Sequence, residues 1–312
     1  MCQNHEGRAT RRQILKGAAG AVALAAGLPV ASQAAQLRRR VLVSPAQPGG
    51  EKAATKGNIN HSVCPWCFEK HWNLETLCQH AVALGLKSVE LVEPKDFPVL
   101  KKYGLVCAIT NSHGFVKGFN NKEHHEWAAD ILRKQIDACA AAGCCPTVIT
   151  FSGFRKGIPD DVGIDNTVEG LKKVVGYAEE KKINLCIEVL NSRVDVEMKG
   201  HPDYQCDKVE WAAEVCKRIG SPRMTFLFDL YHVQIMQGDV ITRIKQFKDY
   251  IGHYHVAGVP GRNEPDDTQE INYPAVMKAI VGTGYKGYVG QEFIPTREPL
   301  ESLRQAIKLC DV

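Results

Sequence analysis

The sequence lacks a strong excess of charge of either sign. Its 312 residues carry a formal net charge of only +4, and residues 1–34 hold Arg8, Arg11, Arg12 and Lys16 against Glu6. Without that segment the chain is close to neutral. A nucleic-acid partner would require a basic face for its phosphates. The composition therefore argues against a function in nucleic-acid binding.

The sequence also lacks, after its first 34 residues, any apolar run long enough to span a membrane. Within residues 1–34 the pair Arg11 and Arg12 precedes an Ala-rich apolar run and small residues, which is the layout of an export signal. This segment resembles a twin-arginine signal, so we expect the twin-arginine machinery to export the protein to the periplasm. A single membrane anchor is the alternative. Residues 35–57 are expected to be a flexible lead-in to a domain over residues 58–312.

A second CxxC motif, which a zinc site would need, is absent as well. The chain has 12 cysteines, but it is large enough to build a core without disulfides. Cys64 and Cys67 have the spacing of a redox motif, yet no thioredoxin-like pattern surrounds them. We expect most cysteines to be reduced and buried, and the "CPWC" motif to be structural or incidental.

Short apolar runs alternate with longer amphipathic segments from residue 58 to the end. The runs that predict strands are residues 59–66, 88–92, 105–110, 147–153, 183–190, 224–231, 253–259 and 287–293. The segments that predict helices are residues 73–85, 97–104, 124–143, 167–182, 208–220, 240–252, 273–284 and 300–310.

Eight strand-helix units in about 250 residues predict an α/β fold, a single (β/α)8 TIM barrel. Glycines are expected to end several of its helices: Gly85, Gly143, Gly220 and Gly252. The competing architecture is an open doubly wound sheet. It would carry a glycine-rich phosphate loop after the first strand, and none follows residues 59–66.

The last four predicted strands end on residue types that bind metals. In a barrel of this kind functional side chains project from the carboxyl ends of the strands. The residues found there are Glu188, Asp229, His255 and Glu292. Taken singly, each acid could instead cap a helix or pair with a surface lysine. Their recurrence on four adjacent strands favours a shared site.

Three carboxylates buried together would repel one another and raise their pKa values unless a cation lay among them. The pattern therefore predicts a divalent metal. Three carboxylates with one imidazole suit Mn²⁺ or Mg²⁺, with Co²⁺ and Zn²⁺ as alternatives. An octahedral ion would leave positions for substrate oxygens.

Three blocks of the sequence resemble a known family. "FDLYHVQIMQGD", "IGHYHVAGVPGRNEP" and "EINYPAVMKAIVGTGYKGYVGQEF" are similar to the corresponding stretches of hydroxypyruvate isomerases, which belong to the xylose isomerase-like sugar isomerase and epimerase barrels. The likeness runs from residue 58 to the end and is densest over residues 183–293. It implies that Glu188, Asp229 and His255 are metal ligands together with Glu292. It further implies that both glutamates exchange protons with substrate.

The resemblance has three departures. His255 stands where hydroxypyruvate isomerases carry glutamine and ketose 3-epimerases carry histidine. Residues 191–208 form a longer segment than in the cytoplasmic enzymes, and an export signal is unusual among them. These departures affect the identity of the substrate rather than the fold or the metal.

Two further residues match family motifs. His232 completes a D-x-x-H motif and could hydrogen-bond a substrate oxygen or the base, or it could pack against Tyr231. Arg262 matches a "PGR" arginine and could bind a substrate carboxylate in bidentate fashion. Its alternative role is to tie its loop to Glu264 or Asp266.

Three other side chains are candidates by position. Trp66 could form an apolar wall of the substrate pocket, and His113 follows the third predicted strand and could line that pocket. Both could equally pack within the barrel. His253 lies one layer deeper than His255 and is expected to be a hydrogen-bonded residue of the barrel interior.

The predicted function is a metal-dependent intramolecular oxidoreductase that interconverts hydroxypyruvate and 2-hydroxy-3-oxopropanoate, or a similar small pair. The metal would stabilise an enediolate while Glu188 or Glu292 moves the proton. A ketose 3-epimerase acting on free sugars is the close alternative. A hydrolase of the endonuclease IV type would need more histidine ligands at its strand ends than this chain has. A metal-binding barrel without catalytic activity is a further alternative. The protein could also form a homo-oligomer.

Overall fold

The computed structural model of the chain describes residues 51–312. The predicted export signal and most of the predicted lead-in lie outside this part. In the described part, six strands form one parallel sheet in the order β1-β6-β5-β4-β3-β2. Their bounds are β1 Asn60–Val63, β2 Thr147–Thr150, β3 Asn184–Glu188, β4 Met224–Asp229, β5 Ile251–Val256 and β6 Tyr288–Gln291.

Two extended segments close the gap between β1 and β2. Residues 88–92 lie beside β1, because the backbone N–H of Glu90 donates to the carbonyl of Val63 at 3.0 Å. Isolated parallel bridges then join Ser88 to Val106 and Thr110 to Val148 in β2. The predicted eight-membered barrel is therefore confirmed, although two of its eight predicted strands are extended segments without a continuous ladder.

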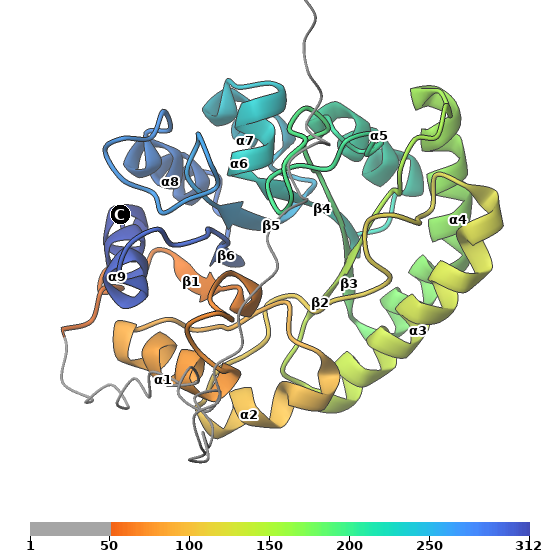
Figure 1. The fold of residues 1–312 in the computed structure, drawn as a ribbon. Coiled ribbons are helices and arrows are strands. Elements are labelled where there is room, and N and C mark those ends of the chain that lie inside the picture. Colours follow the sequence, from red (N-terminus) through yellow and green to blue (C-terminus); the bar gives the residue numbers. More distant parts are fainter. Residues whose placement is uncertain (1–50) are drawn as a thin grey trace, which may run out of the picture. The chain divides into compact units, whose positions relative to one another are not determined.

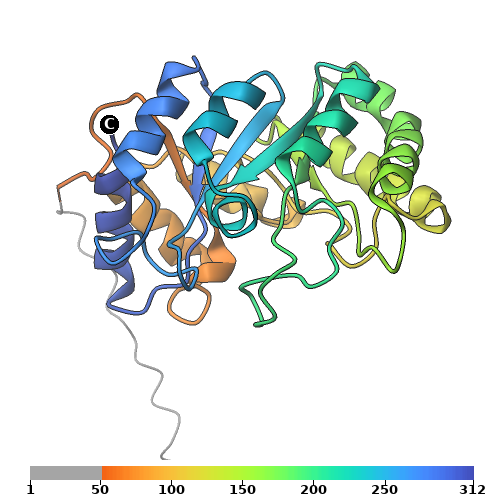
Figure 2. The same cartoon turned by 90° about the horizontal axis from the view of Figure 1, so that it is seen from above.

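Helices surround the sheet on the outside (Figure 1). Their bounds are α1 Leu74–Leu84, α2 Phe97–Lys102, α3 His125–Ala142, α4 Asp160–Lys181, α5 Val209–Ile219, α6 Leu230–Met236, α7 Val240–Phe247, α8 Tyr273–Gly282 and α9 Pro299–Cys310. Figure 2 shows the connections that follow β3 and β5 on the same side of the barrel. Within residues 51–312 no helix combines the length and apolar character needed to cross a membrane.

Glycines end three helices as predicted. Gly85, Gly143 and Gly220 adopt left-handed conformations after α1, α3 and α5, where a side chain would be strained. The prediction for Gly252 is wrong, because α7 ends at Phe247 and Gly252 lies inside β5. A Cβ at this position would lie 2.1 Å from Oγ1 of Thr225 in β4, so the glycine permits close strand contact.

The buried core holds most of the cysteines. The 11 cysteines among residues 51–312 form no disulfide, and ten of them are buried. Burial raises the pKa of Cys64 and of Cys67 well above the ordinary thiol value. Both thiols are therefore poor nucleophiles, as expected for reduced structural cysteines.

The described end of the predicted lead-in is attached to the barrel. Ala53 is buried, and the carboxylate of Asp311 accepts hydrogen bonds from the backbone N–H groups of Thr55 at 2.8 Å and Lys56 at 3.0 Å. This contact ties the start of the described chain to its carboxyl terminus.

Candidate metal centre and substrate pocket

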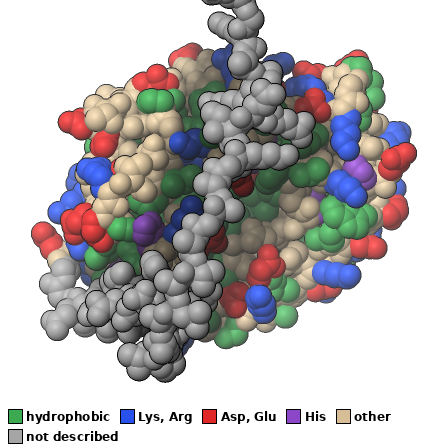
Figure 3. All heavy atoms as spheres, viewed as in Figure 1, with side chains coloured by type: hydrophobic (Ala, Val, Ile, Leu, Met, Phe, Trp, Pro, Cys, Tyr) green, Lys and Arg blue, Asp and Glu red, His purple; other side chains and the backbone are tan. Residues whose placement is uncertain are grey.

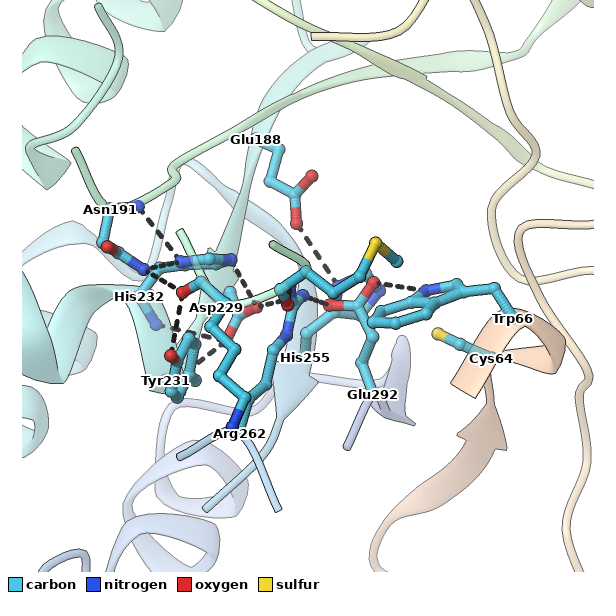
Figure 4. A network of polar contacts seen from close by, with 12 residues as sticks. Cys64, Trp66, Glu188, Asn191, Asp229, Tyr231, His232, His255, Arg262 and Glu292 are labelled. Carbon is cyan, nitrogen blue, oxygen red and sulfur yellow. Dashed lines mark hydrogen bonds and ion pairs between the residues drawn. The ribbon is translucent and has the colours of Figure 1, made fainter. Parts of the chain in front are cut away.

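Four side chains of metal-binding type converge at the carboxyl ends of the strands (Figure 4). Glu188 and Asp229 are the last residues of β3 and β4. His255 is the penultimate residue of β5, and the parallel register places it opposite Asp229. Glu292 directly follows β6. We call these four residues the ligand cluster.

The ligand cluster is compact and buried. One ligand atom from each of its four side chains lies within 4.8 Å of the others. Nδ1 of His255 lies 3.4 Å from Oε1 of Glu188 and 3.0 Å from Oε2 of Glu292. The four residues predicted from the strand ends therefore lie together in the fold.

Several atoms of the ligand cluster have no hydrogen-bond partner within residues 51–312. They are Oε1 of Glu188, Oδ2 of Asp229 and Nδ1 of His255. Unpaired buried polar atoms are costly and rare in folded proteins. A shared divalent ion would satisfy all three, and carboxylate and imidazole donors suit Mn²⁺ or Mg²⁺. The residues therefore fit a metal.

The two glutamates of the ligand cluster differ in their electrostatic surroundings. Burial raises the pKa of Glu188 above its ordinary value, and the charge of Glu292 adds to this effect. Burial acts in the same direction on Glu292, but His255 and Arg262 outweigh it and hold its pKa well below the ordinary range. Such a divergence is typical of acid-base pairs. The surroundings therefore favour the protonated form of Glu188 and the ionised form of Glu292.

Asp229 combines two tasks. Its Oδ1 accepts the backbone N–H of Tyr231 at 2.8 Å and that of His232 at 3.4 Å, which caps the start of α6. Its Oδ2 remains directed into the ligand cluster. Burial, followed by the charge of Glu292, raises the pKa of Asp229 to about 7. Since one oxygen suffices for the cap, the other is available to a cation.

Arg262 lies inside the site rather than at its rim. Its Nη2 is 2.6 Å from Oε2 of Glu292 and 3.6 Å from Oδ2 of Asp229. The guanidinium lies between the rings of Trp66 and Tyr231, 5.0 and 5.5 Å from their centroids. A positive charge of the chain itself therefore already compensates part of the negative charge of the ligand cluster.

The suggested tie between Arg262 and the acids of its own loop is not formed. Arg297 takes that role, with Nε 2.9 Å from Oε1 of Glu264 and Nη2 3.2 Å from Oδ2 of Asp266. Arg262 instead donates from Nη1 to the carbonyl of Met198 at 2.9 Å. The long segment after β3 is thereby linked to the loop after β5.

His232 is fully buried and its tautomer can be assigned. The backbone N–H of Asn191 donates to Nδ1 of His232 at 3.0 Å, so the proton of the neutral ring lies on Nε2. Nε2 is 3.5 Å from Oδ2 of Asp229. Burial, and then the charge of Arg262, lower the pKa of His232 well below its ordinary value. His232 is thus a neutral donor directed at the ligand cluster.

Trp66 and His113 occupy different surroundings. Trp66 lines the pocket. Its indole Nε1–H also donates to Oε1 of Glu292 at 3.0 Å, so Trp66 holds this carboxylate in addition to forming part of the pocket wall. The nitrogens of His113 contact the carbonyl of Lys117 at 3.0 Å and Oγ1 of Thr150 at 2.9 Å. The structure therefore places His113 in the support of the pocket wall, not among the pocket-lining residues.

A cavity of about 590 Å³ opens beside the ligand cluster. Its lining includes Trp66, Glu188, Arg262 and Glu292, together with the apolar side chains of Phe115, Phe151, Phe154, Leu190 and Met198. Figure 3 shows hydrophobic side chains gathered near the middle of this face. The pocket therefore combines charged groups of the ligand cluster with an apolar lining.

Glu90 is a buried residue beside the ligand cluster that the pattern of strand ends did not predict. This residue lies in the extended segment 88–92 and is fully buried, and its Oε1 lies 2.9 Å from Nε2 of both His253 and His255. The available signal was a lone carboxylate within the apolar run "SVELV". A charge in such a run requires a buried partner.

Comparison with known proteins places this chain in a family. Residues 78–311 match the family model described as xylose isomerase-like TIM barrel. A Xenopus laevis protein that carries the provisional name hydroxypyruvate isomerase is 26% identical over 269 residues, covering 85% of this chain and 91% of that protein. A 2-oxo-tetronate isomerase of Cupriavidus necator is 34% identical over 128 residues, covering 41% of this chain and 46% of the relative.

Solved structures agree on the fold. The structure of an AP endonuclease of family 2 from Brucella melitensis shares 24% identity, with a TM-score of 0.68 over 78% of this chain and 97% of that chain. A 3-keto-D-glucoside 4-epimerase from E. coli shares 14% identity, with a TM-score of 0.66 over 80% of this chain and 97% of that chain.

Some sequence relatives match over only part of their length. The match to a human protein with the provisional name hydroxypyruvate isomerase spans 47% of that relative's length at 32% identity.

Proposed function

The chain belongs to the xylose isomerase-like TIM barrel family, and from this premise we propose that it is a metal-dependent isomerase. The proposed reaction interconverts hydroxypyruvate and 2-hydroxy-3-oxopropanoate, or a closely similar hydroxy-oxo acid. The names of its relatives, hydroxypyruvate isomerase and 2-oxo-tetronate isomerase, support this class of substrate.

One observation carries the proposal. Three buried atoms without partners, on Glu188, Asp229 and His255, converge within one ligand cluster beside an open cavity. Glu292 completes the cluster with an ionised carboxylate. A bound divalent ion would stabilise negative charge on adjacent substrate oxygens. Within residues 51–312 single unpaired oxygens also occur at Asp207 and Asp311, so the convergence of several unpaired atoms beside a cavity is what distinguishes the ligand cluster.

The reaction moves one proton between neighbouring carbons. A proton leaves the hydroxymethyl carbon of hydroxypyruvate and returns to the former carbonyl carbon, while a hydroxyl proton passes from one oxygen to the other. We assign the carbon-to-carbon transfer to Glu188, because burial raises its pKa and Oε1 has no partner. Trp66 and Arg262 hold Glu292 in a fixed ionised position.

Arg262 is the proposed contact for the substrate carboxylate. It lines the cavity, and its Nε has no hydrogen-bond partner within residues 51–312. Of the four N–H groups on Nη1 and Nη2, one donates to Glu292 and one to the carbonyl of Met198. The Nε–H and one N–H on each terminal nitrogen therefore remain, which suffices for the bidentate contact with a substrate carboxylate.

The proposal is tested by incubating the purified protein with hydroxypyruvate and Mn²⁺ in D₂O. We expect product formation, with deuterium incorporated from the solvent during proton transfer. E188Q should lower turnover by about 10²–10⁴-fold, because the amide cannot accept the proton. E292Q should also lower turnover, since a neutral amide replaces an ionised group of the cluster. Full activity in both variants would refute the assignment.

A ketose 3-epimerase is the second candidate, and the size of the cavity favours it. About 590 Å³ lies within the range of pockets that hold drug-sized ligands, so a three-carbon acid would leave much of the space empty. Parallel assays with hydroxypyruvate and D-fructose separate the two, since the isomerase should favour the acid by kcat/KM and the epimerase the ketose.

We also propose that residues 1–34 direct export through the twin-arginine machinery to the periplasm. The motif lies outside the described residues, so its sequence alone supports this proposal. A fusion of residues 1–34 to a folded reporter should reach the periplasm of normal cells and remain in the cytoplasm of cells without that machinery. Equal export in both would contradict the proposal.

A further inference from the structure

Glu90 lies beneath the ligand cluster, on the opposite side of His255. Its side chain is fully buried, and its backbone is held by the hydrogen bond from its N–H to Val63. Oε1 of Glu90 lies 2.9 Å from Nε2 of His255 and 2.9 Å from Nε2 of His253. Sγ of Cys64 lies 3.6 Å from the same oxygen. A single carboxylate oxygen thus contacts two imidazoles.

These contacts fix the orientation of His255. An ionised carboxylate only accepts hydrogen bonds, so the proton of each contacting ring lies on Nε2. Nδ1 of His255 is then the nitrogen left to bind a metal once it has given up its proton, and it faces Glu188 and Glu292. The two nitrogens of one ring therefore have separate tasks, one toward Glu90 and the other toward the ligand cluster.

Gly290 provides the space that Glu90 occupies. It pairs in register with His255 on the neighbouring strand β6. A Cβ added to Gly290 would lie 2.0 Å from Oε1 of Glu90 and 3.1 Å from Cδ2 of His255. Any larger residue would therefore displace the carboxylate from the histidines. The absence of a side chain here is a local requirement of the contact between Glu90 and His255.

We infer that Glu90 is a positioning residue that presents Nδ1 of His255 to a metal in the ligand cluster, and that Gly290 is required for this contact. The inference rests on the proposed metal-dependent function. Carboxylate partners of metal-binding histidines orient the ring and increase its basicity, and losing such a partner costs about 10–100-fold in metal affinity. Glu90 itself contacts neither substrate nor metal in this arrangement.

The main test measures the dissociation constant of Mn²⁺ by calorimetry for the unaltered protein, E90A, E90Q and G290A. We expect E90A and G290A to weaken binding by about 10–100-fold. E90Q should have a smaller effect, because its amide oxygen still accepts a hydrogen bond. G290A changes neither the charge nor the residues of the ligand cluster. A loss of Mn²⁺ affinity similar to that of E90A would therefore show that the added Cβ displaces the carboxylate of Glu90. Unchanged affinity in E90A and G290A would overturn the inference.

Two control variants separate positioning from general stability. Asp311 is another buried acid beside a buried histidine, with Oδ1 3.5 Å from Nε2 of His61, so D311N should reduce stability but leave Mn²⁺ affinity unchanged. Gly176 lies inside α4, and a Cβ there would meet nothing within 4 Å, so G176A should slightly raise stability and leave Mn²⁺ affinity unchanged. If D311N weakens Mn²⁺ binding as much as E90A does, a general loss of stability explains the result and the inference fails.

A second readout does not depend on metal. Nitrogen-15 NMR of the metal-free protein, labelled in histidine and measured where the rings are neutral, reports which nitrogen of His255 carries the proton. We expect Nε2–H in the unaltered protein and a partial shift to Nδ1–H in E90A. An identical tautomer in both would contradict positioning by Glu90. If the unaltered protein binds no Mn²⁺, the proposed function fails, while this tautomer measurement still decides the role of Glu90. Should E90A not fold, E90Q and G290A supply both readouts.

Discussion

Two buried glutamates of this protein differ in how their oxygens are used. Glu264, in the loop after β5, accepts hydrogen bonds from the backbone N–H of Thr296 at 3.0 Å, from Arg297 at 2.9 Å and from Ser302 at 2.9 Å. Burial opposes its ionised form, but backbone N–H groups and Arg297 lower its pKa to about 2. Glu188, in the ligand cluster, retains an unpaired oxygen and a raised pKa.

The comparison shows that burial of a carboxylate does not by itself indicate function. At Glu264 the protein supplies all the donors, and the carboxylate holds a loop in place. At Glu188 one oxygen has no hydrogen-bond donor in the described part of the chain. Oδ2 of Asp229 and Nδ1 of His255 also lack a partner there and lie in the same ligand cluster. Unpaired atoms that converge beside a cavity are the feature that indicates a binding site.

Replacing each of the two glutamates by glutamine tests this comparison most directly. E188Q should lower turnover by about 10²–10⁴-fold while the protein stays folded, because it loses a proton carrier. E264Q should keep turnover and lose about 1–3 kcal/mol of the free energy of unfolding, because an amide cannot accept all of those hydrogen bonds. Kinetics and urea unfolding check both. Equal losses of turnover in the two variants would contradict the distinction.

Acid should weaken the fold through a histidine outside the ligand cluster. Burial lowers the pKa of His61 from 6.5 to about 4 despite the nearby carboxylate of Asp311. The unfolded chain then binds a proton that the folded chain does not. The stability from this group is therefore present above about pH 6.5 and is lost as the pH falls toward 4, on the order of 3 kcal/mol.

Urea unfolding of the metal-free protein at several pH values measures this effect. The variant H61Q removes the titrating ring and should show a shallower decline between pH 6.5 and 4. An identical pH dependence in both proteins would show that His61 is not responsible for the loss.

Metal binding should stabilise the folded chain. An ion that binds only the native state at 100 times its dissociation constant adds about 2.7 kcal/mol to the free energy of unfolding. We expect Mn²⁺ to raise the unfolding midpoint, EDTA to reverse the increase, and E264Q to respond as the unaltered protein does. A midpoint that does not change with Mn²⁺ would contradict a metal site in the ligand cluster.

The smallest expected effect concerns the two tasks of Asp229. D229N keeps an oxygen to cap α6, whereas D229A removes the acceptor for the N–H of Tyr231. D229A should therefore be less stable than D229N by about 1 kcal/mol, while both weaken Mn²⁺ binding. Urea unfolding without metal isolates the cap. Equal stability of the two variants would indicate that Oδ1 contributes no cap.

Much of the site followed from the sequence because strand ends are local signals. Periodic apolar runs placed Glu188, Asp229 and Glu292 at one end of the barrel, and the structure brings them together with His255. The same runs could not predict that residues 88–92 form only isolated contacts, because ladder formation depends on segments far apart in the chain.

The sequence could not predict contacts between residues that lie far apart in the chain. The hydrogen bond from Trp66 to Glu292 joins residues 226 positions apart, and Glu90 reaches His255 across 165 positions. The position of Arg262 inside the site depends on where its loop meets the long segment after β3. No local pattern encodes such distances, whereas a lone glutamate within "SVELV" did signal an unknown buried partner.

The central claim is that the ligand cluster binds one divalent ion. Calorimetric titration of the purified metal-free protein with Mn²⁺ tests it most directly, with E188Q and E264Q titrated beside it. The account predicts one ion per chain, weaker binding in E188Q and unchanged binding in E264Q. Absence of binding in the unaltered protein, or equal affinity in all three proteins, would contradict it.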